Sequence, residues 1–427
     1  MFNTLTRMGA SGAVGEYEID KSLRMNTNDS SHLTRTFDEA GNTKTFTLSS
    51  WFKFTKAGNQ DFLWMTGGDG NNKFALVREG VTQINFECHH SSSQVARFYT
   101  SNMLRDFSNW YHFVLAIDTT QSTESDRMKF YINGVEPTMG GQSVSTDYPS
   151  LNLDFLWGTN SAAHFIGKRS YAVNANDWSD MYVAESYYID GTACAATAFG
   201  ETHADTGQWV PKKFEGSYGN AGYYLKFDDD SNNTAATLGK DSSGNSNNWT
   251  PTNHSVSGTA TDSFSDTPTN NFPILNWNQT GSVTDDRLHD GSLSIDWQDS
   301  HNNKSTVVTH GMHSGKWYFE VTNRTDASGQ GALNLGMFPD SYITGKIAST
   351  DSTWPGGYSG SGIGFNGSDQ WYLNGSNQGT YGGTWAENDI IGFAVDVDAG
   401  KIAVSKNGQW ADGSGNYDEA TVNAQKD

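Results

Sequence analysis

The sequence predicts an all-β protein with two antiparallel β-sandwich domains joined by a connector rich in Ser, Thr and Asn. Short apolar stretches recur along the chain between Gly, Asn and Asp residues, as in sandwiches of short strands. Aromatic residues make up 13% of the chain, and a few large rings can fill a thin core even though only 35% of residues are hydrophobic. No long apolar stripe at a helical period is present, which argues against a helical bundle.

The first 200 residues contain most of the expected strands. Residues 45–54, 110–118 and 181–189 carry strand signals, and 110–118 is apolar along nearly its whole length. A further strand, 128–132, leads into Asn133-Gly134, a dipeptide typical of two-residue hairpin turns. These features predict one antiparallel sandwich.

Five stretches of this region share a family pattern, in which a strand with Trp-Tyr-His is followed by a Tyr-x-Asn-Gly turn and later by a strand ending in Ile-Asp-Gly. The pattern resembles the laminin-G-like, concanavalin-A-like jelly roll and covers about residues 17–200, which we take as the first domain. None of its parts is catalytic. The stretches that carry the resemblance are 22–37, 44–54, 109–120, 127–136 and 181–191.

Residues 201–271 differ in character from the first domain. Residues 222–228 and 240–250 look like the opening strand and turn of a second laminin-G unit, but no complete unit follows. This segment either completes the first sandwich or forms a small connector with extra strands. Residues 255–271 are rich in Ser, Thr, Gly and Asp and read as a linker.

Residues 272–427 are expected to form a second sandwich. Its strand signals are 315–321, 390–397 and 401–405, followed by the hairpin dipeptide Asn407-Gly408. Together they resemble a SPRY domain, with Asn388-Asp389 where the family usually has Gly-Asp. SPRY modules bind and are not known as catalysts. At least one further strand is expected after the hairpin, so we expect this domain to be truncated at its C-terminus.

The sequence contains no complete catalytic or metal-binding pattern. Jelly rolls are shared with glucanases, whose catalytic strand has the pattern Glu-x-Asp-x-x-Glu; the nearest stretch here is Glu18-Ile-Asp20, with Leu23 in place of the third carboxylate. His89 and His90 would point to opposite faces of a strand. Residues 228–233 lack the glycine of an EF-hand loop. The protein is therefore not expected to be an enzyme.

Two predictions about ligands remain open. No cofactor is expected, except that laminin-G-like folds often hold calcium at one rim; the metal ligands are unassigned. Rings among Gly, Ser and Asn in 350–385 suit stacking against sugars, although SPRY cores also use many Trp residues. The candidate ligand-binding residues are Trp354, Tyr358, Trp371, Tyr372, Tyr381 and Trp385.

The charge of the chain and its lack of targeting signals limit which partners and compartments are expected. The formal net charge of −21 argues against nucleic acid and favours neutral or cationic sugars over anionic ones. No apolar run approaches transmembrane length, and the N-terminus lacks the apolar region of a signal peptide. Cys88 and Cys194 are too few for a disulfide framework, and we expect two buried free thiols.

The order of segments from the N-terminus through both domains resembles bacteriophage virion proteins, especially those of marine phages. The resemblance implies a non-catalytic structural protein, a tail fibre or surface decoration, that presents glycan- or host-surface-binding sandwiches. It implies synthesis in the host cytoplasm, location in the virion and a homo-oligomer. We expect residues 1–16 to anchor the chain to other virion subunits. The alternative is a bacterial cell-surface or secreted lectin-like adhesin.

Overall fold

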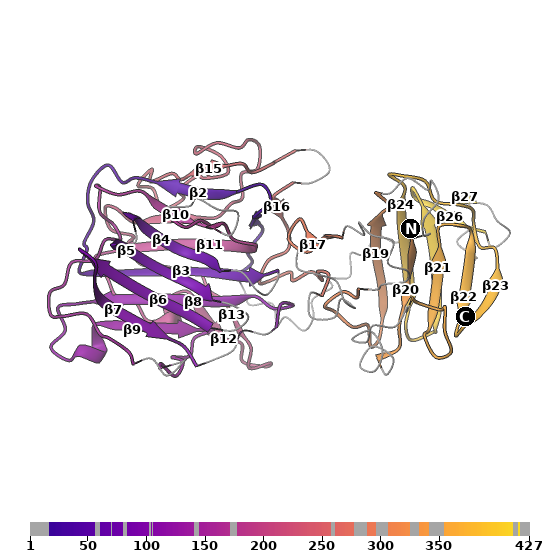
Figure 1. The fold of residues 1–427 in the computed structure, drawn as a ribbon, viewed down its shortest axis with the longest axis horizontal. Coiled ribbons are helices and arrows are strands. Elements are labelled where there is room, and N and C mark those ends of the chain that lie inside the picture. Colours follow the sequence, from indigo (N-terminus) through magenta and orange to yellow (C-terminus); the bar gives the residue numbers. More distant parts are fainter. Residues whose placement is uncertain are drawn as a thin grey trace. The chain divides into compact units, whose positions relative to one another are not determined.

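A computed structural model describes residues 17–55, 60–69, 71–79, 83–101, 104, 106–140, 145–170, 177–257, 261–276, 288–295, 306–324, 333–340, 354–412 and 417–418 (Figure 1). The expected arm, 1–16, lies outside these residues. The described part consists of antiparallel strands and short 3₁₀ turns such as η1 (Glu124–Asp126) and η4 (Ala196–Ala198). Within it, no helix has both the length and the apolar character needed to cross a membrane. The all-β prediction is confirmed.

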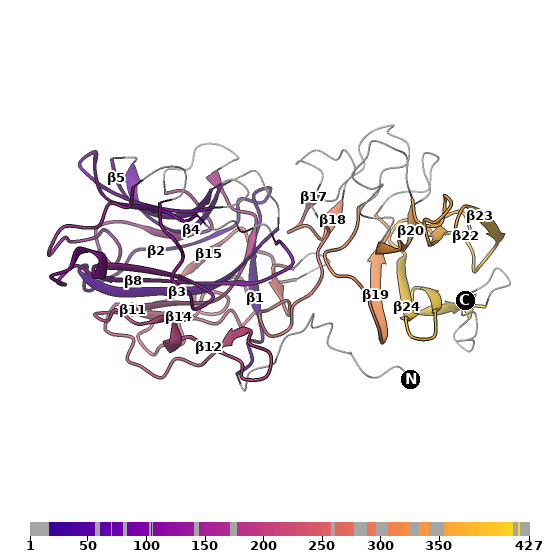
Figure 2. The ribbon, with the colours of Figure 1, turned by 90° about the horizontal axis from the view of Figure 1, so that it is seen from below.

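The first compact unit contains two seven-stranded antiparallel sheets, A and B. Their two layers are visible in Figure 2, with β4 and β5 in one and β3, β8 and β11 in the other. Sheet A has the order β16 (Ser263–Phe264), β1 (Ser22–Met25), β11 (Met181–Asp190), β3 (Thr45–Phe54), β8 (Tyr111–Asp118), β9 (Met128–Ile132), with β14 (Tyr223–Leu225) also paired to β11.

Sheet B continues as a series of hairpins. From β4 to β7 each strand pairs with the next in sequence, because short turns return the chain alongside itself. The order is β15 (Thr250–Thr252), β2 (His32–Arg35), β10 (His164–Ile166), β4 (Asp61–Asp69), β5 (Asn72–Glu79), β6 (Gln83–His90), β7 (Ser93–Tyr99).

Aromatic rings fill the space between the two sheets. Phe52 of sheet A lies edge-on to Trp64 of sheet B with ring centroids 5.5 Å apart, and Phe98 of sheet B lies 5.1 Å from Phe130 of sheet A. All four rings have no exposed surface. The large rings thus compensate for the low aliphatic content. Cys88 is buried in this unit and Cys194 is half-buried, and both are free.

The outer face of sheet A is covered by a second apolar layer from the segment after β11. Phe199 and Phe214 stack on each other and pack against Tyr187 of β11. This layer includes the small hairpin of β12 (Gly200–Thr202) and β13 (Trp209–Pro211). Sheet A therefore presents little open surface here for a ligand.

The segment expected as a connector adds strands to the first sandwich. β14 pairs with β11, β15 with β2 and β16 with β1. The first unit accordingly extends to Ile274, beyond the boundary expected near residue 200, and takes in Leu288–Ile295 as well. That last piece contains the two-residue strands β17 (Leu288–His289) and β18 (Ser294–Ile295).

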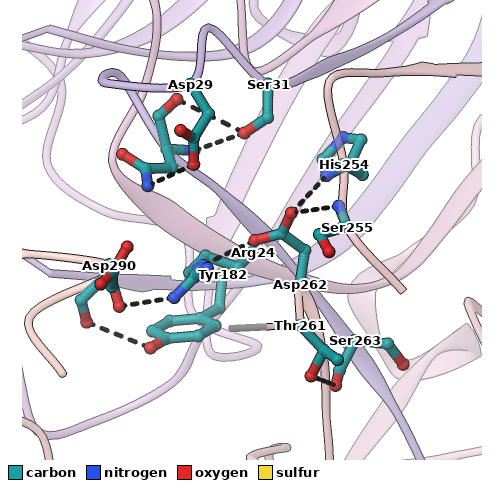
Figure 3. Close-up of polar contacts among 12 residues, drawn as sticks. Arg24, Asp29, Ser31, Tyr182, His254, Ser255, Thr261, Asp262, Ser263 and Asp290 are labelled. Atoms are coloured by element: carbon teal, nitrogen blue, oxygen red, sulfur yellow. Dashed lines mark hydrogen bonds and ion pairs between the residues drawn. The ribbon is translucent and has the colours of Figure 1, made fainter. Parts of the chain in front are cut away.

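A cluster of buried polar contacts holds this late segment to the sandwich (Figure 3). Arg24 Nη1 donates to the carbonyl oxygen of Asp290 at 2.8 Å, and Tyr182 Oη donates to that of Gly291 at 3.1 Å. Gly291 has a φ of +67°, and a Cβ there would lie 2.7 Å from the Tyr182 hydroxyl, so only glycine fits. The backbone N–H of Ser255 donates to Asp262 in the same cluster.

The second compact unit has one five-stranded and one four-stranded antiparallel sheet. Apolar residues from both, such as Phe365 and Phe393 with centroids 5.8 Å apart, form its core. The five-stranded sheet runs β19 (Lys316–Thr322), β24 (Ile390–Asp396), β25 (Lys401–Lys406), β26 (Gln409–Ala411), β27 (Tyr417–Asp418), and the four-stranded one β20 (Asn334–Met337), β21 (Ile363–Asn366), β22 (Gln370–Leu373), β23 (Ser376–Gly379).

Candidate functional site

The structure divides the six candidate rings of the second unit between its core and its surface. Tyr381 and Trp385 are only 1% and 2% exposed and pack edge-on to each other in the core. Tyr381 Oη donates to the carbonyl oxygen of Asn366 at 2.9 Å, which fixes the ring inside. These two rings offer no face to a ligand. The expectation fails for them because the surrounding Gly and Asn residues form turns that return the rings to the core.

Trp371 also belongs with the core, since it is partly buried against it and stacks on Phe365. Tyr372, the next residue of β22, faces the opposite side of the sheet. There it meets Trp354 edge-on, with centroids 4.7 Å apart. Tyr358, in the same loop as Trp354, is 38% exposed. The structure thus brings Trp354 and Tyr372 together on the outer face of the four-stranded sheet.

A second candidate surface lies on the outer face of sheet B, in the first unit. Along β6, Ile84, Phe86 and Cys88 point into the core, so the alternating residues Asn85, Glu87 and His89 point outward. Arg97 and Tyr99 of β7 lie opposite Glu87 and Asn85. We call the side chains of Lys73, Glu79, Asn85, Glu87, His89, Arg97 and Tyr99 the polar face.

Hydrogen bonds fix the centre of the polar face. Asn85 Nδ2 donates to Glu79 Oε2 at 3.1 Å and to Glu87 Oε1 at 3.4 Å, and Lys73 Nζ donates to Glu87 Oε2. Burial raises the pKa of Glu87, but the hydrogen bond and charge of Lys73 outweigh it, so the pKa is lowered overall. Glu87 is therefore ionised and paired at neutral pH.

Burial and neighbouring charges also set the protonation states of His89 and Tyr99 at the edges of the polar face. Burial, followed by the positive charge of Lys73, lowers the pKa of His89, so that its ring is neutral at pH 7. Burial and the charges of Glu79 and Glu87 raise the pKa of Tyr99 to about 12. Arg97 lies 3.6 Å from the Asp147 carboxylate. Cations and carboxylates therefore alternate on this surface without a single-sign patch.

Three polar atoms of this face have no hydrogen-bond partner in the described part of the chain. They are Asn85 Oδ1, His89 Nε2 and Arg97 Nε. Asn85 is 8% exposed, and a buried polar atom without a partner costs free energy. The set contains an acceptor, Asn85 Oδ1, and a donor, Arg97 Nε. Apolar and polar residues alternate along β6 in the sequence, and this alternation is the signal that predicts an outward-facing polar row. Only His89 and His90 of this strand were considered as site residues from the sequence alone.

Apolar side chains adjoin the polar face on the same side of sheet B. Phe62, Met65, Ala75 and Val77 form a buried cluster, against which Phe165 of β10 packs. Ala75 and Val77 pair with Glu87 and Asn85 of β6. The four side chains of the cluster are only 2–6% exposed, so they support the polar face from the side and leave little apolar surface open to a ligand.

The carboxylates of Glu18, Asp20 and Glu185 lie in two different settings. Glu18 and Asp20 are exposed and precede β1. The buried Glu185 accepts hydrogen bonds from the hydroxyls of Tyr17, Tyr224 and Tyr187 and is only 3% exposed, so that it is closed to substrate. Its φ of +47° belongs to a bulge of β11 between Ala184 and Tyr187.

Among the described residues, no group of three or more His, Cys, Asp or Glu side chains could hold a metal ion. In the acidic stretch after β14, each carboxylate has its own partner. Asp228 pairs with Lys226, Asp229 with Ser231, and Asp230 with Lys21. The expectation of a calcium ion stays a prediction.

Comparisons with known proteins place the first unit in a fold superfamily. The Laminin_G_3 family, described as the concanavalin A-like lectin/glucanases superfamily, matches residues 25–178, less than half of the chain. A search of curated proteins found no match.

Solved structures with similar folds include a heptameric SAP-like pentraxin from Limulus polyphemus (14% identity, covering 42% of this chain and 80% of that one, TM-score 0.29). A second is the CBM40 of Ruminococcus gnavus IT-sialidase (13% identity, covering 42% of this chain and 92% of that one, TM-score 0.25). A third is the tailspike protein 2 of Escherichia coli O157:H7 bacteriophage CAB120 (14% identity, covering 42% of this chain and 23% of that one, TM-score 0.28). These values carry no functional argument. Taken with the two packed sheets, the family match shows that the chain contains a concanavalin A-like jelly-roll domain.

Proposed function

We propose that this protein is a non-catalytic structural component of a bacteriophage virion, a tail fibre or surface decoration, whose jelly roll binds a host-surface glycan. The observation that carries the binding proposal is the polar face with its unpartnered Asn85 Oδ1, His89 Nε2 and Arg97 Nε. The resemblance of the sequence to marine phage virion proteins supports the virion part. The second unit is proposed to be a SPRY-like binding module, and residues 1–16 to attach the chain to other subunits of a homo-oligomer.

The chemistry of the polar face favours a neutral glycan. Lys73 is paired with Glu87, and Arg97 lies beside Asp147, so neither cation is free to neutralise an acidic sugar. Glu79 and Glu87 would repel a carboxylate or sulfate. Sugar hydroxyls can donate to Asn85 Oδ1 and accept from Arg97 Nε once the side chains that cover these buried atoms move aside. The net charge of −21 acts in the same direction over longer distances.

A glycan array probed with the full chain tests the binding proposal. Asn85→Ala removes the unpartnered acceptor without removing a charge, and we expect it to lower neutral-glycan affinity about tenfold, the effect of roughly 1.4 kcal/mol. Asn160→Ala changes an exposed amide of the same unit and serves as the matched control. Equal binding by wild type and Asn85→Ala would contradict the proposed site.

The second candidate function is a bacterial surface or secreted lectin-like adhesin, which would use the same face. Mass spectrometry of purified phage particles separates the two candidates. Peptides of this chain in particles support the virion role, and their absence from particles together with presence on bacterial cells supports the adhesin. Deleting residues 1–16 should abolish incorporation into particles if that segment is the anchor.

A further inference from the structure

The outer face of the four-stranded sheet in the second unit carries a loop that packs directly on its backbone. Gly336 and Gly364 are paired neighbours on this face, and a Cβ at Gly364 would overlap the backbone of Pro355. Gly356 has a φ of +75°, and its carbonyl oxygen accepts a hydrogen bond from the N–H of Gly375 at 2.8 Å. The absence of side chains at these positions lets residues 354–357 lie flat on the sheet and fixes the position of Trp354.

The fixed loop holds Trp354 against Tyr372 in an edge-on pair with an interplanar angle of 88°. In such a pair, one ring presents its edge to a face of the other. The backbone of Gly357 also lies against the Trp354 ring, since a Cβ there would be 2.2 Å from Trp354 Cε2. Both residues are partly exposed. The pair is therefore held in place by residues 354–357 and offers partly exposed ring surface to a ligand.

Amide groups flank the ring of Tyr372. Its hydroxyl donates to Gln370 Oε1 at 2.7 Å and accepts from Asn377 Nδ2 at 3.2 Å. Gln370 Nε2 donates no hydrogen bond within the described part of the chain, so this group can donate to a ligand. The nearby carboxylate of Asp369 is used by the backbone N–H groups of Tyr381, Gly382 and Gly383. The hydrogen-bonding groups beside the rings are thus uncharged.

From this geometry we infer a second ligand site, formed by Trp354, Gln370, Tyr372 and Asn377, that takes a neutral saccharide. The C–H face of a pyranose ring stacks on the aromatic pair, while its hydroxyls accept from Gln370 Nε2 and exchange hydrogen bonds with Asn377. An acidic sugar finds no cation among these four residues. This site lies in a different unit from the polar face and does not depend on it.

Fluorine NMR of the full chain labelled with 5-fluorotryptophan tests the inference. The Trp354 resonance is assigned with Trp354→Phe, and the first site is disabled by Asn85→Ala in every sample. The probes are neutral oligosaccharides (cellohexaose, maltoheptaose and the neutral hits of the glycan array) and polygalacturonate as the charged counterpart. We expect at least one neutral probe to shift the Trp354 resonance saturably, whereas polygalacturonate does not.

Variants separate recognition from folding. Tyr372→Ala should weaken the saturable response at least tenfold, and Tyr372→Phe, which keeps the ring and loses only the hydroxyl, should weaken it less. Tyr318→Ala, at a 47% exposed tyrosine of the other sheet, is the matched control and should leave it unchanged. A Trp354 resonance that no neutral probe shifts, or that polygalacturonate shifts equally, overturns this site while leaving the polar face untouched.

Discussion

Arg24 and Asp262 form a buried ion pair although 238 positions separate them in the sequence: Arg24 Nε lies 2.7 Å from Asp262 Oδ1, and the two side chains are 3% and 2% exposed. The pair joins β1 to the segment just before β16. Arg24 also donates a hydrogen bond through Nη1 to the carbonyl oxygen of Asp290, in the segment Leu288–Ile295. It therefore connects three parts of the chain that are distant in sequence.

Asp262→Ala should destabilise the first unit strongly, because it leaves the Arg24 guanidinium buried without its counter-charge. Loss of one partner of a buried pair costs about 3–5 kcal/mol. Asp38→Ala, which breaks the Arg35–Asp38 pair at a 95% exposed aspartate, should change stability little. Urea denaturation of both variants measures the difference, and equal midpoints would contradict it.

The buried histidines should make the protein less stable as the pH falls below about 6.5. Burial lowers the pKa values of His112, His164 and His254 to about 3, so the unfolded chain binds more protons than the folded one between pH 3 and 6.5. Each such histidine contributes a slope of up to about 1.4 kcal/mol per pH unit in this window. His254→Asn should reduce the slope of unfolding free energy against pH; an unchanged slope would refute this.

Glu185 affects the pH dependence of stability in the opposite sense to the buried histidines, and Glu185→Gln should remove its contribution. Burial raises the pKa of Glu185 although three tyrosine hydroxyls act against it, so the folded state keeps this proton to a higher pH than the unfolded state. The wild type therefore loses stability from this group as the pH rises above about 4.5 through the raised pKa, and the glutamine variant does not. Unfolding free energies from pH 4.5 to 8 measure the effect. Tyr187→Phe, which removes one hydroxyl but keeps the acid, should retain it.

Trp385→Ala should destabilise the second unit by about 3–5 kcal/mol, as expected for truncating a fully buried aromatic residue. Tyr358→Ala, at a 38% exposed ring of the same unit, should change stability by less than about 1 kcal/mol. Thermal denaturation of both variants checks this. Similar losses would place Tyr358 in the core and contradict the division of rings made here.

Local patterns predicted the individual strands well. The expected strand 45–54 matches β3, 181–189 lies within β11, and 401–405 lies within β25. The hairpin dipeptides also behave as expected, since Asn133 and Gly134 have φ values of +48° and +78°. These features depend on residues close together in sequence, which is why they could be predicted.

The candidate sites depend on contacts between residues far apart in sequence. The packing of Tyr381 on Trp385, and the loop that seats Trp354 beside Tyr372, follow from the three-dimensional course of the chain. The same holds for His112, which stacks on Trp51 and accepts a hydrogen bond at Nδ1 from Trp209 Nε1 at 3.1 Å. A ring in a Gly- and Asn-rich stretch can end on either side of a sheet, so composition alone could not decide which rings face a ligand.

The bond between Tyr17 and Glu185 has a mechanical consequence. Tyr17 stands at the start of the described chain, and its hydroxyl is held by Glu185 on β11, a strand hydrogen-bonded to β1 on one side and β3 on the other. A pull through the residues that precede Tyr17 is therefore shared by two strands, β1 through the backbone and β11 through this hydroxyl. Each of them has a hydrogen-bonded neighbour on both sides, so the force must break two ladders to move either strand, whereas a pull on an edge strand would peel a single ladder one bond at a time.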